Sequence, residues 1–161
     1  VIVEWVHPAT PTASGARIRG HSRRLPPPYT AAMAGLTNLH EILGALRPSV
    51  RQGSFVYVTL PTPPEVEAYA RIVEDEGITL VVDQSTADEH GWEYEGVFAW
   101  ITLQVHTSLT SVGITAAVST ALARVGISCN VLAGYYHDHL LVPSERAAEA
   151  LELLRTLASG A

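Results

Sequence analysis

Lysine is absent from this 161-residue sequence, and its ten basic residues, all arginine, face sixteen acids. The resulting net charge of −6 argues against a polybasic surface for nucleic acid or anionic lipid. A single cysteine, Cys129, excludes an intrachain disulfide and an all-cysteine zinc site. No apolar run approaches the ~20 residues of a membrane-spanning helix, and no basic start precedes an apolar stretch. We therefore expect a cytoplasmic protein without nucleic-acid or membrane partners.

Familiar catalytic motifs are missing as well. The sequence contains no GxSxG, P-loop, GxGxxG or HExxH pattern, and Asp83 and Asp88 form no evident acid–base pair. Apolar residues make up 47% of the chain and charged residues only 16%, which is enough to bury a core. No catalytic set stands out, and we expect a folded protein that carries no cofactor and no metal.

The first 32 residues differ in composition from the rest. Five of the ten prolines and four of the ten arginines precede Met33, together with one acid, so this segment is basic and the remainder acidic. The run Pro26-Pro27-Pro28 withholds backbone donors, which predicts a disordered tail over residues 1–32. We expect Met33 to be the biological start and the tail to be a mis-assigned extension. The alternative is a basic arm that docks on the acidic body or on a partner.

The spacing of apolar residues predicts secondary structure in both halves of the chain. In residues 33–94 we expect a helix, a strand, a hairpin and a short helix: Asn38–Leu46, Ser54–Leu60, Ala70–Glu74 with Ile78–Val82, and Thr86–Trp92. In residues 95–161 we expect a strand, a helix, a strand, a turn, a strand and a helix capped by Ser144: Val97–His106, Ile114–Val125, Ile127–Tyr136, His137–His139, Leu140–Val142 and Ala147–Leu157.

The second half therefore has the order β-α-β-β-α, which is a ferredoxin-like arrangement short of its last strand. Neither half is long enough to bury a large core alone. We expect an α+β fold in which two ferredoxin-like units pack as one by sheet extension, with antiparallel sheets and helices on one face.

The segment Thr107–Thr115 (TSLTSVGIT) leads from a long strand into an amphipathic helix. Amide groups of a first helical turn lack intrahelical partners, and Gly113 lets a ligand approach the backbone, so a carboxylate would fit here. The alternative is an ordinary helix start capped by Ser111 or Thr110. We predict that Asn130 begins the strand facing this loop, where its amide either holds an amino-acid backbone or satisfies a neighbouring loop.

Two histidines flank Asp138 in the predicted turn. In extended chain His137 and His139 would share a side, a spacing compatible with a metal that Cys129 and His106 would help to ligate, although no feature fixes these groups together. The other interpretation is polar turn chemistry. Cys129 lies inside an apolar strand, which argues against a reactive thiolate.

Trp100 lies on the mixed face of the strand whose other face is aliphatic. A residue of this size indicates that the face is covered, either by a second copy of the chain or by the first half of the same chain. We predict a homodimer.

Residues Ser108–Pro143 (SLTSVGITAAVSTALARVGISCNVLAGYYHDHLLVP) resemble the ACT-domain family, in particular small bacterial proteins of tandem ACT-like domains. Shorter matches lie at Phe55–Thr59 and Glu74–Val82. The resemblance implies two tandem ferredoxin-like ACT domains, residues 33–94 and 95–161. Residues 61–70 match this pattern poorly.

ACT domains bind small effectors, mostly amino acids, between paired domains, and commonly dimerise by joining sheets edge to edge. The resemblance thus implies an amino-acid-binding regulatory protein that acts on another polypeptide, since no catalytic domain is attached. Carried over by position, the binding residues are Ser111, Val112, Gly113, Ile114, Thr115, Ser128, Asn130 and Val131, with Glu76, Gly77, His137, Asp138 and His139 as additional candidates. Two alternatives stay open: a small metal- or histidine-dependent enzyme that uses His137 and His139, and an assembly module without a ligand.

Overall fold

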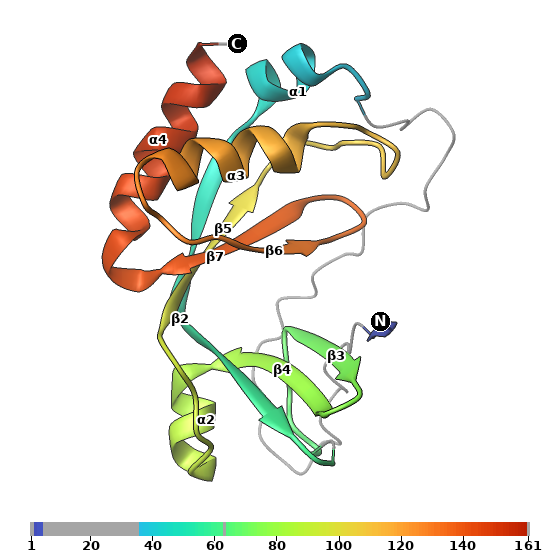
Figure 1. Cartoon of the computed structure of the whole chain (residues 1–161), viewed down its shortest axis with the longest axis vertical. Coiled ribbons are helices and arrows are strands. Elements are labelled where there is room, and N and C mark those ends of the chain that lie inside the picture. Colours follow the sequence, from blue (N-terminus) through green and yellow to red (C-terminus); the bar gives the residue numbers. More distant parts are fainter. Residues whose placement is uncertain (1, 5–35, 63, 161) are drawn as a thin grey trace, which may run out of the picture.

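The computed structural model of the chain describes residues 2–4, 36–62 and 64–160. Figure 1 shows how its strands and helices are arranged. In chain order they are β1 (Ile2–Glu4), α1 (Leu39–Ala45), β2 (Pro48–Leu60), β3 (Ala70–Glu74), β4 (Gly77–Asp83), α2 (Gln84–His90), β5 (Phe98–Leu103), α3 (Ile114–Arg124), β6 (Asn130–Ala133), β7 (Asp138–Pro143) and α4 (Ala147–Ser159). None of the helices in these ranges has the length and apolar content to cross a bilayer.

All seven strands belong to one antiparallel sheet of order β1-β3-β4-β2-β5-β7-β6. The 13-residue strand β2 serves both halves of the chain: Pro48–Arg51 pairs with β5, and Phe55–Leu60 pairs with β4. The sequence predicts only the second of these segments as strand. The expected α+β fold of two ferredoxin-like units packed as one is confirmed, and β2 is the strand that joins them.

The helices pack against one face of this sheet. Ala99 and Ile101 of β5 lie in the larger core, which α1, α3 and α4 cover. At the other end of the sheet, Val56 of β2 packs with Ala87 of α2. Phe55 and Phe98 are paired, so their side chains share one face of the sheet, and Val56 and Ala99, the next residues along each strand, share the other face. The expectation of helices on one face is therefore confirmed.

Helix α1 comes before β2 in sequence but packs on the second unit. Its cap is Asn38, whose Oδ1 accepts a hydrogen bond from the Glu41 amide at 3.2 Å. Ile42 and Leu46 are buried in the core against α3 and α4. The proposed division into domains 33–94 and 95–161 stays a prediction, and both α1 and the start of β2 pack across it.

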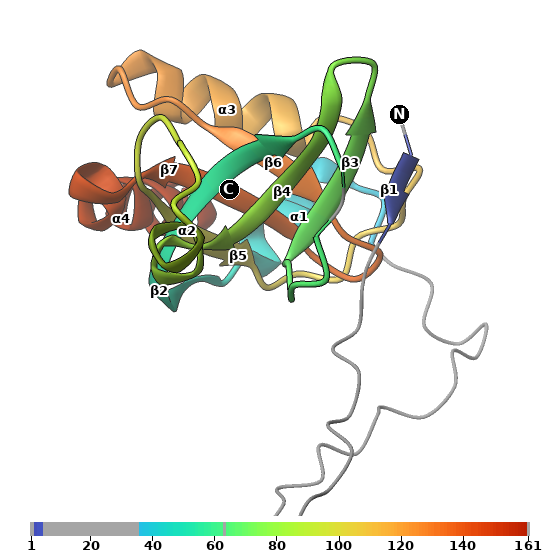
Figure 2. The same cartoon turned by 90° about the horizontal axis from the view of Figure 1, so that it is seen from below.

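Strand β1 pairs antiparallel with β3, with Glu4 opposite Arg71 (Figure 2). The sequence placed these three residues in a disordered tail. The difference arises because β3 would otherwise be an edge strand with unpaired backbone groups. A short segment of high β-propensity such as Ile2–Glu4 can form hydrogen bonds with these groups. The other predictions for the tail, including a start at Met33, lie outside the described residues.

The β6–β7 hairpin differs from the sequence prediction. Strand β6 has four residues rather than ten, and the turn falls earlier, where the Gly134 amide donates to the His137 carbonyl at 3.1 Å. The prediction of a turn over His137–His139 is wrong, because Asp138 and His139 belong to β7 and pair with β5. Backbone pairing across a central strand outweighs the polar character of these side chains.

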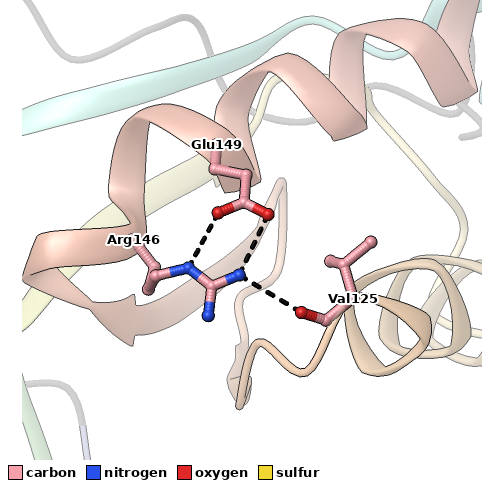
Figure 3. A network of polar contacts seen from close by, with 3 residues as sticks. All are labelled: Val125, Arg146 and Glu149. Atoms are coloured by element: carbon pink, nitrogen blue, oxygen red, sulfur yellow. Dashed lines mark hydrogen bonds and ion pairs between the residues drawn. The ribbon is translucent and has the colours of Figure 1, made fainter.

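Arg146 links the start of α4 to the end of α3. Its guanidinium holds Glu149 through Nε–Oε2 at 2.7 Å and Nη2–Oε1 at 2.9 Å, and donates to the Val125 carbonyl at 3.2 Å (Figure 3). Ser144 does not cap α4 but begins a 3-10 turn, Ser144–Arg146, that has no side-chain cap. The bidentate pair therefore fixes the helix start in place of the predicted cap.

Candidate functional site

The loop between β5 and α3 is held by the chain segment that precedes α1. The Leu36 amide donates to the His106 carbonyl at 3.0 Å, and the Leu36 carbonyl accepts from the Ser108 amide at 3.1 Å. The Ser111 hydroxyl donates to the same carbonyl at 2.6 Å. The loop therefore has a fixed conformation, and Ser111 has a positioning role rather than a free hydroxyl.

Gly113 occupies the N-cap position of α3. Its φ of +102° is a conformation that favours glycine, and no side chain caps the helix. Among the described residues, no acceptor meets the amides of Ile114, Thr115 or Ala116. The prediction of a cap by Ser111 or Thr110 is therefore wrong, and the unpartnered amides that an anion requires are present.

Side chains of two elements border this helix start. A Cβ on Gly113 would lie 3.0 Å from Leu39 Cδ2, so α1 closes one side of the glycine. Val112 is 83% exposed on the loop itself. The amides of α3 thus lie beside an apolar wall and next to solvent, where the dipole of the helix favours a negative group.

The structure does not bring Asn130 to this loop within one chain. The loop begins at Leu103, the last residue of β5, which pairs with Asp138 of β7. Asp138 also pairs with Ala133, the last residue of β6, whereas Asn130 is the first residue of β6 and pairs with Leu141. Leu132 packs on the face without helices, so alternation places Asn130 there too. Val131 packs into the helix-covered core, and Ser128 is exposed. The expectation that Asn130 faces the loop is wrong, because α3 spans the length of the sheet before β6 begins.

Glu76 and Gly77 lie at the far end of β2 from this loop. Glu76 is exposed in the β3–β4 turn, and Gly77 begins β4 with a φ of +152°. A Cβ on Gly77 would be 2.8 Å from the carbonyl oxygen of Leu60, the last residue of β2. The loop before α3 lies near the other end of β2, where Pro48 pairs with Leu103. Gly77 therefore has a packing role in the hairpin and does not share a site with Gly113.

The two histidines hold β7 to the end of β5. His137 Nδ1 lies 3.3 Å from the Val105 carbonyl oxygen, and His139 Nδ1 lies 3.1 Å from Thr102 Oγ1. Burial raises the pKa of Asp138 above its usual value, and burial also raises the pKa of the Cys129 thiol. In the described ranges, no three His, Cys, Asp or Glu side chains are grouped to hold a metal ion. The arrangement is that of polar groups satisfied within a hairpin.

Conformational stability is expected to fall as the pH drops from 6.5 towards 4, because of His139. Burial, followed by the positive charges of Arg51 and His137, lowers the pKa of His139 from 6.5 to about 4. Between these values the unfolded chain binds a proton that the folded chain does not, so acid favours unfolding, and the full contribution is present above pH 6.5. Urea unfolding of His139→Gln should show a weaker loss of stability across this window than the parent. Identical pH profiles would contradict the assignment.

A cluster on the helix-free face was missed by the sequence analysis. Phe55 and Tyr69 place their rings 5.5 and 5.6 Å from Trp100, and the Arg51 guanidinium lies over Tyr69 and Trp100. Of the two explanations for Trp100, cover by the first half of the same chain is the correct one. Arg51 gave no signal in the sequence, because it lies in a polar stretch that the pattern did not identify as strand.

Comparison with known proteins gives consistent results. Two matches to the ACT domain cover residues 34–99 and 96–156. A solved structure from Vibrio cholerae, described as a protein of unknown function and possible transport protein, is 40% identical over 74% of this chain and 95% of its own, with a TM-score of 0.69.

More distant structures share the fold. A protein from Agrobacterium tumefaciens is 19% identical over 70% of this chain and 89% of its own, with a TM-score of 0.59. The ligand-free regulatory subunit of aspartate kinase from Thermus thermophilus is 13% identical over 68% and 95%, with a TM-score of 0.51. None of the curated proteins matches the chain significantly.

Proposed function

Because the chain belongs to the ACT-domain family, we propose that it is a cytoplasmic regulatory protein without catalytic activity that binds an amino acid. The ligand's α-carboxylate accepts hydrogen bonds from the amides at the start of α3, contributed by Ile114 and Thr115 beside Gly113. The observation that carries this proposal is that these amides have no acceptor among the described residues and that the helix has no side-chain cap.

We further propose that the site is completed at a homodimer interface. Asn130 and Ser128 lie at or beside β6, which is an edge strand of the sheet, and both are exposed. Within one chain Asn130 is too far along β6 to reach Gly113. In a dimer formed by joining these edges, the start of the partner subunit's β6 would come beside the end of β6 near the loop, and backbone carbonyls there would face the ligand's ammonium group. Binding would then favour one packing of the subunits, which is how a ligand signal would reach a regulated protein.

Exposed apolar side chains near the start of α3 support an interface there. Leu109 is 69% exposed on the loop, and Tyr135 and Tyr136 are 52% and 43% exposed on the neighbouring β6–β7 turn. The two segments are in contact, since the His106 and Tyr136 rings lie 5.7 Å apart. Apolar groups concentrated around unpartnered amides are typical of a site that a second subunit covers.

An amino acid that binds this site is expected to raise the melting temperature of the full chain. At a ligand concentration of 100 times the dissociation constant, stabilisation should be about 2.7 kcal/mol. The measurement is a thermal-shift screen of the twenty amino acids. A flat response to all twenty would contradict ligand binding and would favour an assembly module.

Variants at α3 locate the ligand. Gly113→Asp puts a carboxylate where the ligand's own would lie and should abolish the shift, whereas Gly126→Asp, at the other end of α3 with open space around it, should not. If Gly113→Asp fails to fold against Leu39, Thr115→Glu adds the competing charge at an exposed position, with Thr120→Glu as its control. A folded Gly113→Asp or Thr115→Glu chain that binds as well as the parent would overturn the site.

A further inference from the structure

The face of the sheet without helices carries a compact group of polar and aromatic side chains, which we call the Arg51 cluster: Arg51, Tyr69, Asp83, Trp100 and His139. The Arg51 guanidinium carbon lies 5.0 Å from the Tyr69 ring centre and 5.1 Å from that of Trp100. His139 also packs on the indole, with its ring centre 5.0 Å from that of Trp100. The residues come from β2, β4, β5, β7 and the segment before β3, so the curvature of the whole sheet brings them together.

The charge of Arg51 is not neutralised by a carboxylate of the described residues. The ion pairs there are Arg146 with Glu149 and Arg155 with Glu152. Asp83, on the same face, accepts the Tyr69 hydroxyl at 2.9 Å and forms no ion pair with Arg51. Arg51 is exposed, and two ring faces orient its planar guanidinium, which is the arrangement that suits bidentate recognition of a carboxylate.

Trp100 supplies a second donor for which no described residue provides an acceptor. The residue is 1% exposed, and its Nε1 is buried without a hydrogen-bond partner in the described part of the chain. A buried donor that lacks an acceptor costs about 1–3 kcal/mol, so an oxygen atom that reaches it gains more than a typical hydrogen bond. The Arg51 guanidinium carbon lies 5.1 Å from the indole ring centre, and Nε1 is buried, so a carboxylate that accepts from both groups must move a side chain that now covers the nitrogen.

The backbone is shaped to bring these groups together. Between Arg51 and Phe55 the pairing of β2 with β5 is irregular, and Gly53 has a φ of +116° there. A Cβ on Gly53 would lie 3.3 Å from both Asp83 Oδ1 and the Phe55 ring. Strand β2 has two extra residues here, so Arg51 lies opposite Trp100; in an unbroken register it would lie opposite Thr102.

We propose that the Arg51 cluster is a second binding site, for a small carboxylate held by the Arg51 guanidinium and the Trp100 indole nitrogen. The site lies on the face opposite α3 and does not depend on the function proposed above. The Asp83 carboxylate accepts a hydrogen bond from the hydroxyl of Tyr69, so a negative charge already lies beside the site. This charge disfavours a doubly charged anion, so the site should prefer a carboxylate to phosphate. His139 is neutral at pH 7, because burial lowers its pKa to about 4, and it packs beside the indole without adding charge.

The test uses the full chain labelled with ¹⁵N at tryptophan and follows the Trp100 indole resonance, which Trp100→Phe identifies among the three tryptophans. Sodium acetate is titrated at constant ionic strength, with chloride and phosphate as separate arms. We expect acetate to move the Trp100 indole proton downfield in a saturable manner, and chloride and phosphate to move it less. Arg51→Gln should weaken acetate binding about tenfold or more, because it removes a charge-assisted hydrogen bond.

Three further variants make the result decisive. Arg51→Lys keeps the charge but loses the planar fork, so it should bind acetate more weakly than the parent and better than Arg51→Gln. Arg124→Gln, at an exposed arginine of α3, removes the same charge elsewhere and should bind as the parent does. Gly113→Asp should also leave the Trp100 response intact, which separates this site from the one at α3. No movement of the Trp100 resonance, or equal binding by Arg51→Gln and the parent, would overturn the proposal.

Discussion

Trp100→Ala is expected to lower the free energy of unfolding by about 3–5 kcal/mol, as truncation of a buried tryptophan does when the cavity cannot collapse. Trp100 is 1% exposed, and its ring packs on Phe55 of β2 and on Tyr69, which precedes β3. Both residues belong to the first half of the chain. Its removal opens the smaller core on the helix-free face, which few residues remain to fill. Urea unfolding followed by circular dichroism measures the loss.

The same variant distinguishes burial of Trp100 by its own chain from burial by a second copy of the chain. Trp92→Ala, at a half-buried residue that packs with α2, is the matched control and should have a smaller effect. Because Phe55 and Tyr69 belong to the same chain as Trp100, the destabilisation by Trp100→Ala should not vary with protein concentration. A loss that is largest at high protein concentration and shrinks on dilution would instead place Trp100 at a subunit interface.

Gly134→Ala is expected to destabilise the chain by about 2–3 kcal/mol, the usual magnitude for overpacking at a site that cannot adjust. A Cβ at this position would lie 2.5 Å from the His137 carbonyl oxygen and 3.4 Å from His139 Nε2. The first contact is with backbone, and the same carbonyl accepts the Gly134 amide, so relief of the overlap breaks the β6–β7 turn. Thermal and urea unfolding of the variant measure the effect.

Gly44→Ala is the control for this substitution. Gly44 lies inside α1, and nothing approaches within 4 Å of the position that its Cβ would take. Alanine is there expected to stabilise the helix by about 1 kcal/mol, because it reduces the freedom of the unfolded chain. A Gly134→Ala chain as stable as the parent would show that the turn can shift without loss of the hairpin.

Regular periodicity made much of the fold predictable from the sequence. Alternation along Phe98–Leu103 identified the faces of β5, and apolar spacing identified α3 and α4 to within a few residues. The hairpin from Ala70 to Asp83 followed from its turn residues. Such elements carry their own signal, since the burial of one face fixes the pattern of side chains along each of them.

Other features depend on contacts between distant segments, which no local pattern records. The start of β2, Pro48–Gly53, is strand only because β5 pairs with it, and its exposed polar residues resemble a loop. The turn at Gly134 was misplaced because polarity suggested His137–His139, whereas pairing with β5 decides the register. For the candidate site, the role of Gly113 at the helix start was predictable from its position. The place of Asn130 was not, because it depends on the length of α3 relative to the sheet.

Strand β2 is shared by the two ferredoxin-like units, and this has a consequence for how the chain folds. A cut between residues 94 and 95 would leave β5 without its long neighbour and would remove Ile42 and Leu46 from the core beneath α3 and α4. Neither unit is therefore an autonomous module, even though the sequence repeats a family pattern twice. We therefore expect the chain to fold and unfold as one cooperative body, because β2 pairs with strands of both units.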